Sequence, residues 1–153
     1  MIDRRYALGS VLVAGAFALG GCGMMDSMSS SAAKPAMAPG EMSATLKGSN
    51  EVPPNSSGGS GSAKVNLSGN SLTWTITYSG TTGPVTAGHF HGPATASANA
   101  GVVVPFPPSS LPSPITGSAT LTDAQVADLK AGKWYINLHT AANPGGELRG
   151  QVN

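Results

Sequence analysis

Residues 133–140 read KWYINLHT, and residues 147–152 read ELRGQV after an intervening Asn-Pro-Gly-Gly. Apolar and polar side chains alternate in the first segment: Trp134, Ile136 and Leu138 on one face, Tyr135, Asn137 and His139 on the other. A two-residue period is typical of a strand with one apolar and one polar face. The Pro-Gly-Gly residues favour a tight turn. The two segments are therefore predicted to form a β-hairpin that carries His139 on its polar face.

Six further segments alternate in the same way or are short apolar runs bounded by turn residues: 44–47, 63–67, 72–78, 85–92, 101–106 and 115–121. In residues 72–78, every second position is Thr, a β-branched residue that favours strands. Residues 122–132 are the exception, because Thr122 or Asp123 can cap a helix that Gly132 ends. The pattern predicts an all-β fold, a single antiparallel β-sandwich of Greek-key or immunoglobulin-like type with one short helix.

Residues 1–21 are predicted to be a signal peptide, because Arg4 and Arg5 precede a short apolar run. The run ends in Leu-Gly-Gly-Cys22, which resembles a bacterial lipoprotein box; the alternative is a lone cysteine in an ordinary signal peptide. The paired arginines also resemble a twin-arginine export signal. We expect a lipid on Cys22 that anchors the protein to a membrane, a disordered tether over 22–42 and a folded domain over 43–153.

The expected location is extracytoplasmic. Gly23 follows Cys22 in place of Asp, which resembles outer-membrane sorting and indicates the periplasmic face or the cell surface in a Gram-negative cell. The net charge is +1 and only 10% of residues are charged, so the chain lacks the basic surface that a nucleic-acid partner requires. No Ser-His-Asp, Cys-His, paired-carboxylate or phosphate-loop pattern is present, which indicates a non-enzymatic protein.

The chain's three histidines are the candidate functional residues. His89 and His91 flank Phe90, which suits the core, so both imidazoles should lie on the opposite face of their strand. All three histidines are then expected on the strand faces that point away from the core. If the two strands are neighbours, three imidazoles could bind copper or zinc and leave one position open, for storage or redox chemistry. Such binding should weaken as pH falls through about 6.5. The alternative is that the ring nitrogens bond to nearby backbone and serve the fold alone.

Glu147, Arg149 and Glu51 are further charged residues in the conspicuous segments. Glu147 and Arg149 share a face, and a surface ion pair of Glu147 with Arg149 or Lys133 is expected in preference to a role as acid ligand or base. For Glu51, capping a loop and approaching the histidines both remain open.

Four motifs occur in a specific order: Glu51-Val52-Pro53-Pro54, then Ala87-Gly88-His89-Phe90-His91-Gly92-Pro93-Ala94, then Trp134 to Thr140, then Asn143 to Val152. Together they resemble the CHRD domain, named for chordin, an extracellular antagonist of growth factors. The resemblance covers residues 43–153 and implies an extracytoplasmic all-β binding or interaction module. We therefore expect a protein or glycan partner in the cell envelope, without carrying over the growth-factor binding of chordin.

Overall fold

A computed structural model describes residues 39–153 of the chain. The expected signal peptide over 1–21, Cys22 and the tether as far as residue 38 lie outside the described residues. The first strand begins at Glu41, so the last two residues of the range expected for the tether belong to the sheet. Within 39–153, no helix is both long enough and apolar enough to cross a membrane.

Eight strands and one α-helix form the described part of the chain, together with two short 3-10 helices that the sequence did not predict. In chain order they are β1 (Glu41–Lys47), η1 (Gly48–Asn50), β2 (Ser60–Ser68), β3 (Ser71–Ser79), β4 (Val85–His91), β5 (Val102–Pro105), η2 (Pro108–Ser110), β6 (Ile115–Thr120), α1 (Asp123–Lys130), β7 (Tyr135–Thr140) and β8 (Leu148–Gln151). The expected strands, the C-terminal hairpin and the single helix are confirmed.

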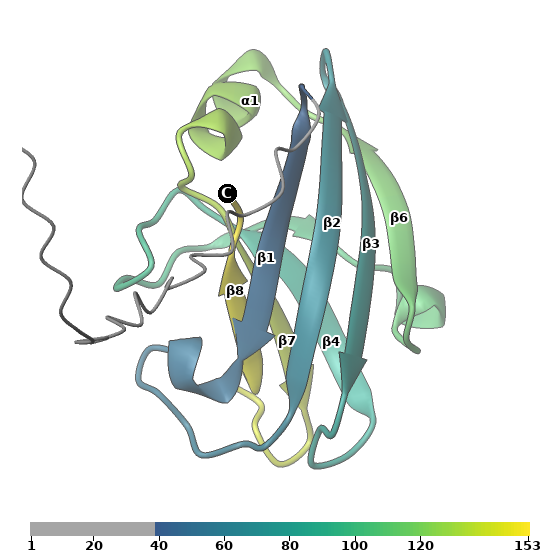
Figure 1. Cartoon of the computed structure of the whole chain (residues 1–153), viewed down its shortest axis with the longest axis vertical. Helices are drawn as coiled ribbons and strands as arrows, with labels where there is room; N and C mark the ends of the chain where they lie inside the picture. Colours follow the sequence, from purple (N-terminus) through teal and green to yellow (C-terminus); the bar gives the residue numbers. More distant parts are fainter. Residues whose placement is uncertain (1–38) are drawn as a thin grey trace, which may run out of the picture. The chain divides into compact units, whose positions relative to one another are not determined.

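The strands form one antiparallel sheet in the order β5-β4-β7-β8-β1-β2-β3-β6. The sheet coils, so that β1, β2, β3 and β6 lie in front of β4 and β7 in Figure 1 and the arrangement is nearly barrel-like. The all-β class and the antiparallel pairing are confirmed. The Greek-key, immunoglobulin-like sandwich stays a prediction, because the hydrogen bonds join all the strands into a single sheet.

The concave side of the coiled sheet holds the apolar core. Trp74 of β3 contacts Phe90 of β4 at 5.2 Å and Phe106 after β5 at 5.4 Å, measured between ring centroids. These rings therefore join the two halves of the sheet across its interior. The expected alternation in β3 is confirmed, since Leu72, Trp74 and Ile76 are buried while the Thr residues between them are exposed.

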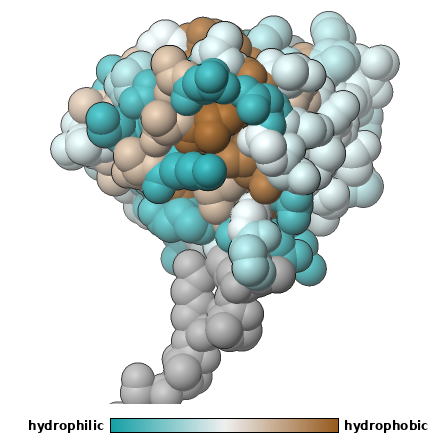
Figure 2. Space-filling model, turned by 90° about the horizontal axis from the view of Figure 1, so that it is seen from above, coloured by the Kyte–Doolittle hydropathy of each residue, from teal (hydrophilic) through white to brown (hydrophobic). Residues whose placement is uncertain are grey.

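Side chains at one end of the molecule show where this core approaches the surface. Seen from above, a patch of hydrophobic atoms is ringed by hydrophilic residues (Figure 2). Around the core as a whole, and not at this end alone, the partly buried apolar residues that pack against it are Met42, Tyr78, Val103, Val104, Ala119 and Val126.

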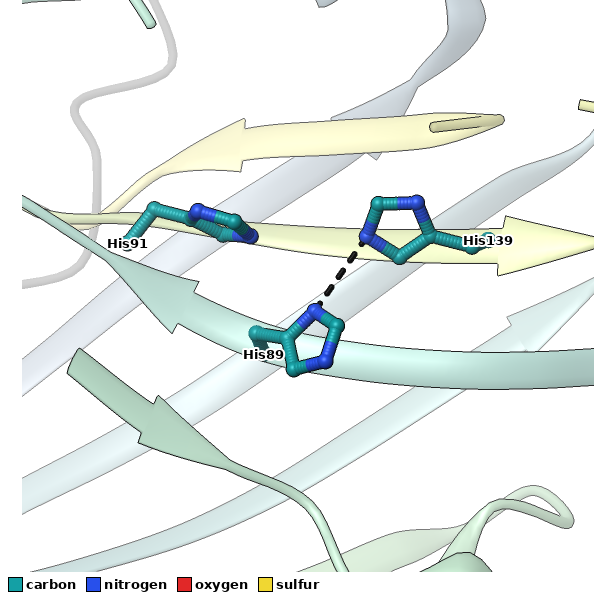
Figure 3. Close-up of side chains that lie close together, drawn as sticks. All are labelled: His89, His91 and His139. Atoms are coloured by element: carbon teal, nitrogen blue, oxygen red, sulfur yellow. Dashed lines mark hydrogen bonds between the residues drawn. The ribbon is translucent and has the colours of Figure 1, made fainter. Parts of the chain in front are cut away.

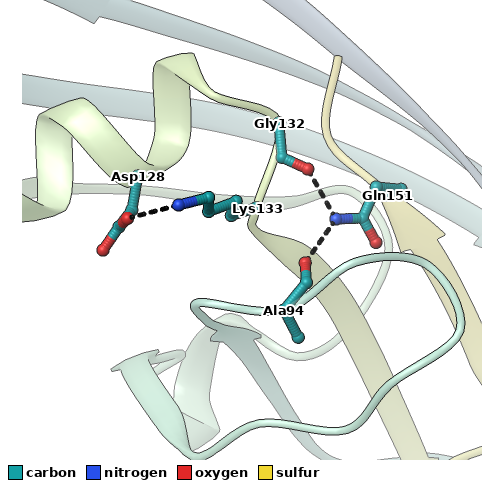
Figure 4. A network of polar contacts seen from close by, with 5 residues as sticks. All are labelled: Ala94, Asp128, Gly132, Lys133 and Gln151. Atoms are coloured by element: carbon teal, nitrogen blue, oxygen red, sulfur yellow. Dashed lines mark hydrogen bonds and ion pairs between the residues drawn. The ribbon is translucent and has the colours of Figure 1, made fainter.

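The helix is fixed at both ends by polar contacts. Thr122 and Gln125 form a reciprocal capping box at its N-terminus, which confirms Thr122 as the cap. Beyond its C-terminus, Gln151 Nε2 donates hydrogen bonds to the carbonyl oxygens of Gly132 at 2.7 Å and Ala94 at 2.9 Å (Figure 4). The last strand thus ties the helix to the loop that follows β4.

A glycine on β6 makes room for the central indole of the core. Gly117 lies directly opposite Trp74 in the β3–β6 ladder. A Cβ atom at Gly117 would lie 2.3 Å from Cζ2 of Trp74, closer than any van der Waals contact. The indole thus covers the backbone of the neighbouring strand, and any side chain at position 117 would displace it.

We predict that Gly117→Ala lowers the free energy of unfolding by about 1–3 kcal/mol through overpacking against Trp74. Gly101→Ala is the matched control, because its Cβ would meet no atom within 4 Å. Denaturant unfolding followed by tryptophan fluorescence measures both variants. Equal stability of the two would contradict the packing described for Trp74.

Candidate metal centre

The pairing of β4 with β7 brings the three histidines together. In this antiparallel ladder His89 lies opposite Asn137, and Ala87 lies opposite His139. His89 and His139 are therefore diagonal neighbours, a separation that long side chains span. Phe90 points into the core as predicted, which leaves His89 and His91 on the other face of β4.

The imidazoles face one another closely (Figure 3). His89 Nδ1 lies 3.3 Å from His139 Nε2. One ring nitrogen from each of His89, His91 and His139 lies within 4.8 Å of the other two. The sequence-predicted convergence of all three residues is thus present in the structure.

Backbone carbonyls orient two of the rings. His91 Nδ1 lies 3.0 Å from the carbonyl oxygen of Ala100, and His139 Nδ1 lies 3.0 Å from that of Pro144. A carbonyl only accepts, so each Nδ1 carries the proton and each Nε2 presents a lone pair. These are the backbone bonds expected if the histidines serve the fold. They are also the outer bonds that orient histidine ligands of metals: they leave His91 Nε2 without a partner and His139 Nε2 facing His89 Nδ1.

The Nε2 atom of His91 is buried and has no hydrogen-bond partner among the described residues. A buried polar atom without a partner costs about 1–3 kcal/mol. A metal ion bound between His89, His91 and His139 would supply the missing interaction. The residues present therefore fit a cation that accepts imidazole nitrogen.

The geometry is close to that of a tetrahedral site. Two nitrogens at about 2.05 Å from Zn(II) lie about 3.3 Å apart along a tetrahedral edge. The separation of His89 and His139 already has this value, and the widest separation, at most 4.8 Å, requires an approach of about 1.5 Å that side-chain rotation can supply. Three protein ligands leave a fourth position for water or another ligand.

All three histidines favour the neutral form that binds metals. Burial lowers the pKa of His89, and the nearby His139 and His91 lower it further. Burial also lowers the pKa of His91, although the bond to Ala100 opposes the shift. The pKa of His139 falls for the same reason, against the effect of its bond to Pro144. Each pKa lies below 6.5, so the lone pairs are available at neutral pH.

His91 of the candidate metal centre stacks on Tyr135, which in turn contacts Arg149. The ring of Tyr135 lies parallel to that of His91, with a centroid separation of 4.9 Å and an angle of 6°. The guanidinium carbon of Arg149 lies 3.6 Å from the centroid of the same tyrosine ring. The two-residue alternation in residues 133–140 predicted that Tyr135 and His139 share a face. Nothing in the sequence pattern indicated that Tyr135 would separate His91 from Arg149.

The expected surface ion pair of Glu147 is wrong. Glu147 and Arg149 are 0% and 1% exposed, and each has other partners. Arg149 donates hydrogen bonds to Asn99 Oδ1 at 2.7 Å and to the Ala98 carbonyl at 2.6 Å. Lys133 pairs instead with Asp128, with 3.7 Å between nitrogen and oxygen. The surface assignment fails because loops cover this face of β8.

The carboxylate of Glu147 holds three segments together. It accepts hydrogen bonds from the hydroxyls of Ser57 at 2.7 Å, Thr82 at 2.7 Å and Thr140 at 2.5 Å, and from the amide of Thr82 at 2.8 Å. Burial alone would raise the pKa of Glu147, but the hydrogen bonds from Ser57, Thr140 and Thr82 outweigh it and lower the pKa to about 2. Glu147 thus anchors the loops and is not a ligand of the histidine cluster.

Glu51 lies on the same side of the sheet but outside the group of three ligand residues. It is 6% exposed, and Asn137 Nδ2 donates a hydrogen bond to its Oε2 at 3.2 Å. Of the two roles left open by the sequence, Glu51 thus approaches the histidine region through Asn137, the residue opposite His89.

We predict that Glu147→Gln lowers the free energy of unfolding by about 2 kcal/mol at pH 7, because an amide nitrogen cannot accept these charge-assisted bonds. The carboxylate stabilises the native state above pH 4.5, its unfolded pKa, and this contribution is lost as pH falls toward 2. The difference between variant and parent should therefore shrink below pH 4.5. Thermal unfolding at several pH values measures it, with Asp128→Asn as control, since the pair of Asp128 with Lys133 lies at the surface and contributes little. A difference that persists at pH 2 would contradict the charged state.

Comparison with known proteins agrees with the motifs. Residues 42–152 match the CHRD domain, which covers nearly all of the described chain. No curated protein and no solved structure shows a significant match. The chain therefore belongs to the CHRD-domain family. Its CHRD domain is the coiled antiparallel sheet that carries the three-histidine cluster.

Proposed function

We propose that this CHRD domain is a non-enzymatic, extracytoplasmic module that binds one divalent transition-metal ion, Cu(II) or Zn(II), through His89, His91 and His139. The observation that carries the proposal is the buried, unpartnered Nε2 of His91, which lies within reach of the other two imidazoles. Imidazole nitrogens in this number suit both ions. With copper, the open fourth position would also permit redox chemistry.

The cellular setting is part of the same proposal. The signal segment over 1–21 and the lipoprotein-like box ending at Cys22 support a protein tethered by lipid to the outside of a membrane. In a Gram-negative cell, Gly23 favours the outer membrane. Membership of the CHRD family supports a binding module at this location.

The stoichiometry of metal binding tests the proposed site. Titration of the purified protein with Zn(II) or Cu(II) should give one site per chain with a dissociation constant below about 10 µM. His91→Ala or His139→Ala should weaken binding by more than about 100-fold, which is the upper end of the loss seen when only an outer-shell partner is removed. Isothermal titration calorimetry measures both values.

Thr116→Ala, at an exposed position of β6, is a control that should bind as the parent does. Unfolding curves of the metal-free variants separate ligand loss from misfolding. No binding tighter than about 10 µM, together with histidine variants that are merely less stable, would leave the histidines with a structural role only.

The affinity for the metal should depend on pH. Because burial lowers the pKa of all three histidines below 6.5, protons should compete with the metal for the imidazole nitrogens mainly below that value. Affinity should therefore remain measurable at pH 6.5 and fall steeply toward pH 5. The histidines should also make the metal-free domain less stable over this range, since the unfolded histidines bind protons more readily than the folded ones, and Glu51→Gln removes the opposing contribution of Glu51. Affinity that does not change down to pH 5 would contradict histidine ligation.

A second candidate is recognition of a glycan or protein of the envelope. A shallow depression on the outer face of β1, β2 and β3, of about 440 Å³, is lined mainly by hydroxyl groups: Thr45, Ser60, Ser62, Thr77, Tyr78 and Ser79. Such a surface offers both donors and acceptors to a hydroxylated partner. Binding of envelope glycans that Thr77→Val abolishes, with metal affinity unchanged, would support this candidate.

A further inference from the structure

Two buried oxygen atoms near the histidine cluster have no partner among the described residues: Glu51 Oε1 and Asn137 Oδ1. The two side chains already touch, because Asn137 Nδ2 lies 3.2 Å from Glu51 Oε2. The unpartnered atoms also converge on one place. A Cβ atom at Gly146 would lie 2.6 Å from Asn137 Oδ1 and 2.7 Å from Glu51 Oε1.

A single proton satisfies both atoms. If Glu51 is a neutral acid, its Oε1 hydroxyl can donate to Asn137 Oδ1 while Asn137 Nδ2 donates to Oε2. The carboxyl and the amide then form a closed pair with two hydrogen bonds. If Glu51 is ionised instead, two acceptor oxygens face each other inside the protein without a donor, which is unfavourable.

The surrounding groups favour a proton on Glu51 that can still be released near neutral pH. Burial raises the pKa of Glu51 to about 7, against the opposing effects of Arg149 on β8 and of the hydrogen bond from Asn137 on β7. Gly146, in the turn before β8, contributes no side chain. Arg149 is therefore the one fixed charge that acts on Glu51 from these elements, and a second positive charge nearby would favour ionisation.

The histidine cluster is where such a charge would arrive. Asn137 lies directly opposite His89 in the β4–β7 ladder, so Glu51 is separated from the cluster by one side chain. The three imidazoles are neutral ligands and bring no negative charge to a divalent ion. Of the acidic side chains in this polar layer, Glu147 is already ionised and saturated by hydroxyl donors. Glu51 is the carboxyl that can still respond.

We propose that Glu51 is the charge-balancing carboxyl of the three-histidine site: it keeps a proton against Asn137 in the metal-free protein and releases that proton to solvent when a divalent ion binds. The inference rests on the proposed function. The balance is simple, because the ion adds two positive charges, the Glu51 O–H bond breaks, and the carboxylate remains as the proton leaves to buffer. No electron is transferred.

The test is the number of protons released when Zn(II) binds to the purified protein. Calorimetric titration in two buffers with different ionisation enthalpies gives this number, after correction for zinc bound by buffer. Glu51→Gln keeps the shape of the neutral acid and can donate to Asn137 Oδ1, but it has no proton to release. Glu41→Gln, at the exposed first residue of β1, is the matched control.

The parent and Glu41→Gln should release more protons than Glu51→Gln, by about 0.9 at pH 6 and about 0.1 at pH 8, as expected for a group with a pKa of about 7 in the metal-free protein. Glu51→Gln should still bind zinc, with lower affinity at pH 8, because its site lacks the negative charge. Equal proton release from Glu51→Gln and the parent would overturn the proposal while leaving the metal site intact.

Infrared spectroscopy gives a second measurement that does not depend on the variant folding. At pH 6 the metal-free parent should show a protonated-carboxyl band from Glu51, and this band should disappear when zinc is added. A metal-free spectrum without this band would overturn the proposal. If zinc does not bind at all, the proposed function fails and the coupling with it, whereas a band that persists in zinc-bound protein overturns the coupling alone.

Discussion

The register of the β4–β7 ladder is the constraint on which both the core and the candidate site depend. Residues at alternate positions point to opposite faces, so Phe90 and Ile136 enter the core while His89 and Asn137 face the covering loops. A slip of one residue would exchange the two faces. Contacts of Phe90 with Trp74 and Trp134 oppose such a slip, because the rings fill one interior. Packing on one side of the strands thus fixes the geometry of the histidines on the other.

Buried polar groups hold the loops in place on that second side. The chain has a single cysteine, so no disulfide forms within it. Glu147 instead accepts four hydrogen bonds, and Arg149 bonds the loop around Ala98. Most of this layer is satisfied. The unsatisfied atoms gather near the candidate site. Three of the five buried side-chain atoms without a partner among the described residues belong to His91, Glu51 and Asn137. Unsatisfied groups concentrated in one place are typical of a functional site.

Local patterns predicted much of this structure. The alternation in residues 72–78 predicted β3 and its buried face, and the Thr122 cap predicted α1. The sequence predicted the histidine cluster only on the condition that the two histidine strands are neighbours. The pairing of β4 with β7 meets this condition. The burial of Glu147 and Arg149 could not. Their partners come from loops that lie far away in sequence, such as Ser57, 90 residues from Glu147, and no local period reports which loops cover a strand.

The same distinction explains why the sequence did not decide the roles of the outer residues of the site. A ligand histidine is conspicuous because few residue types can bind a transition metal, whereas Asn137, Tyr135 and Glu51 acquire a role only through their neighbours. Tyr135 separates the cluster from the positive charge of Arg149, and Asn137 connects it to Glu51, the buried carboxyl of residues 39–153 that still has an oxygen without a partner. Three neutral imidazoles define where a cation fits. The electrostatic response to that cation has to come from the layer behind them, and Glu51 is the group placed to provide it.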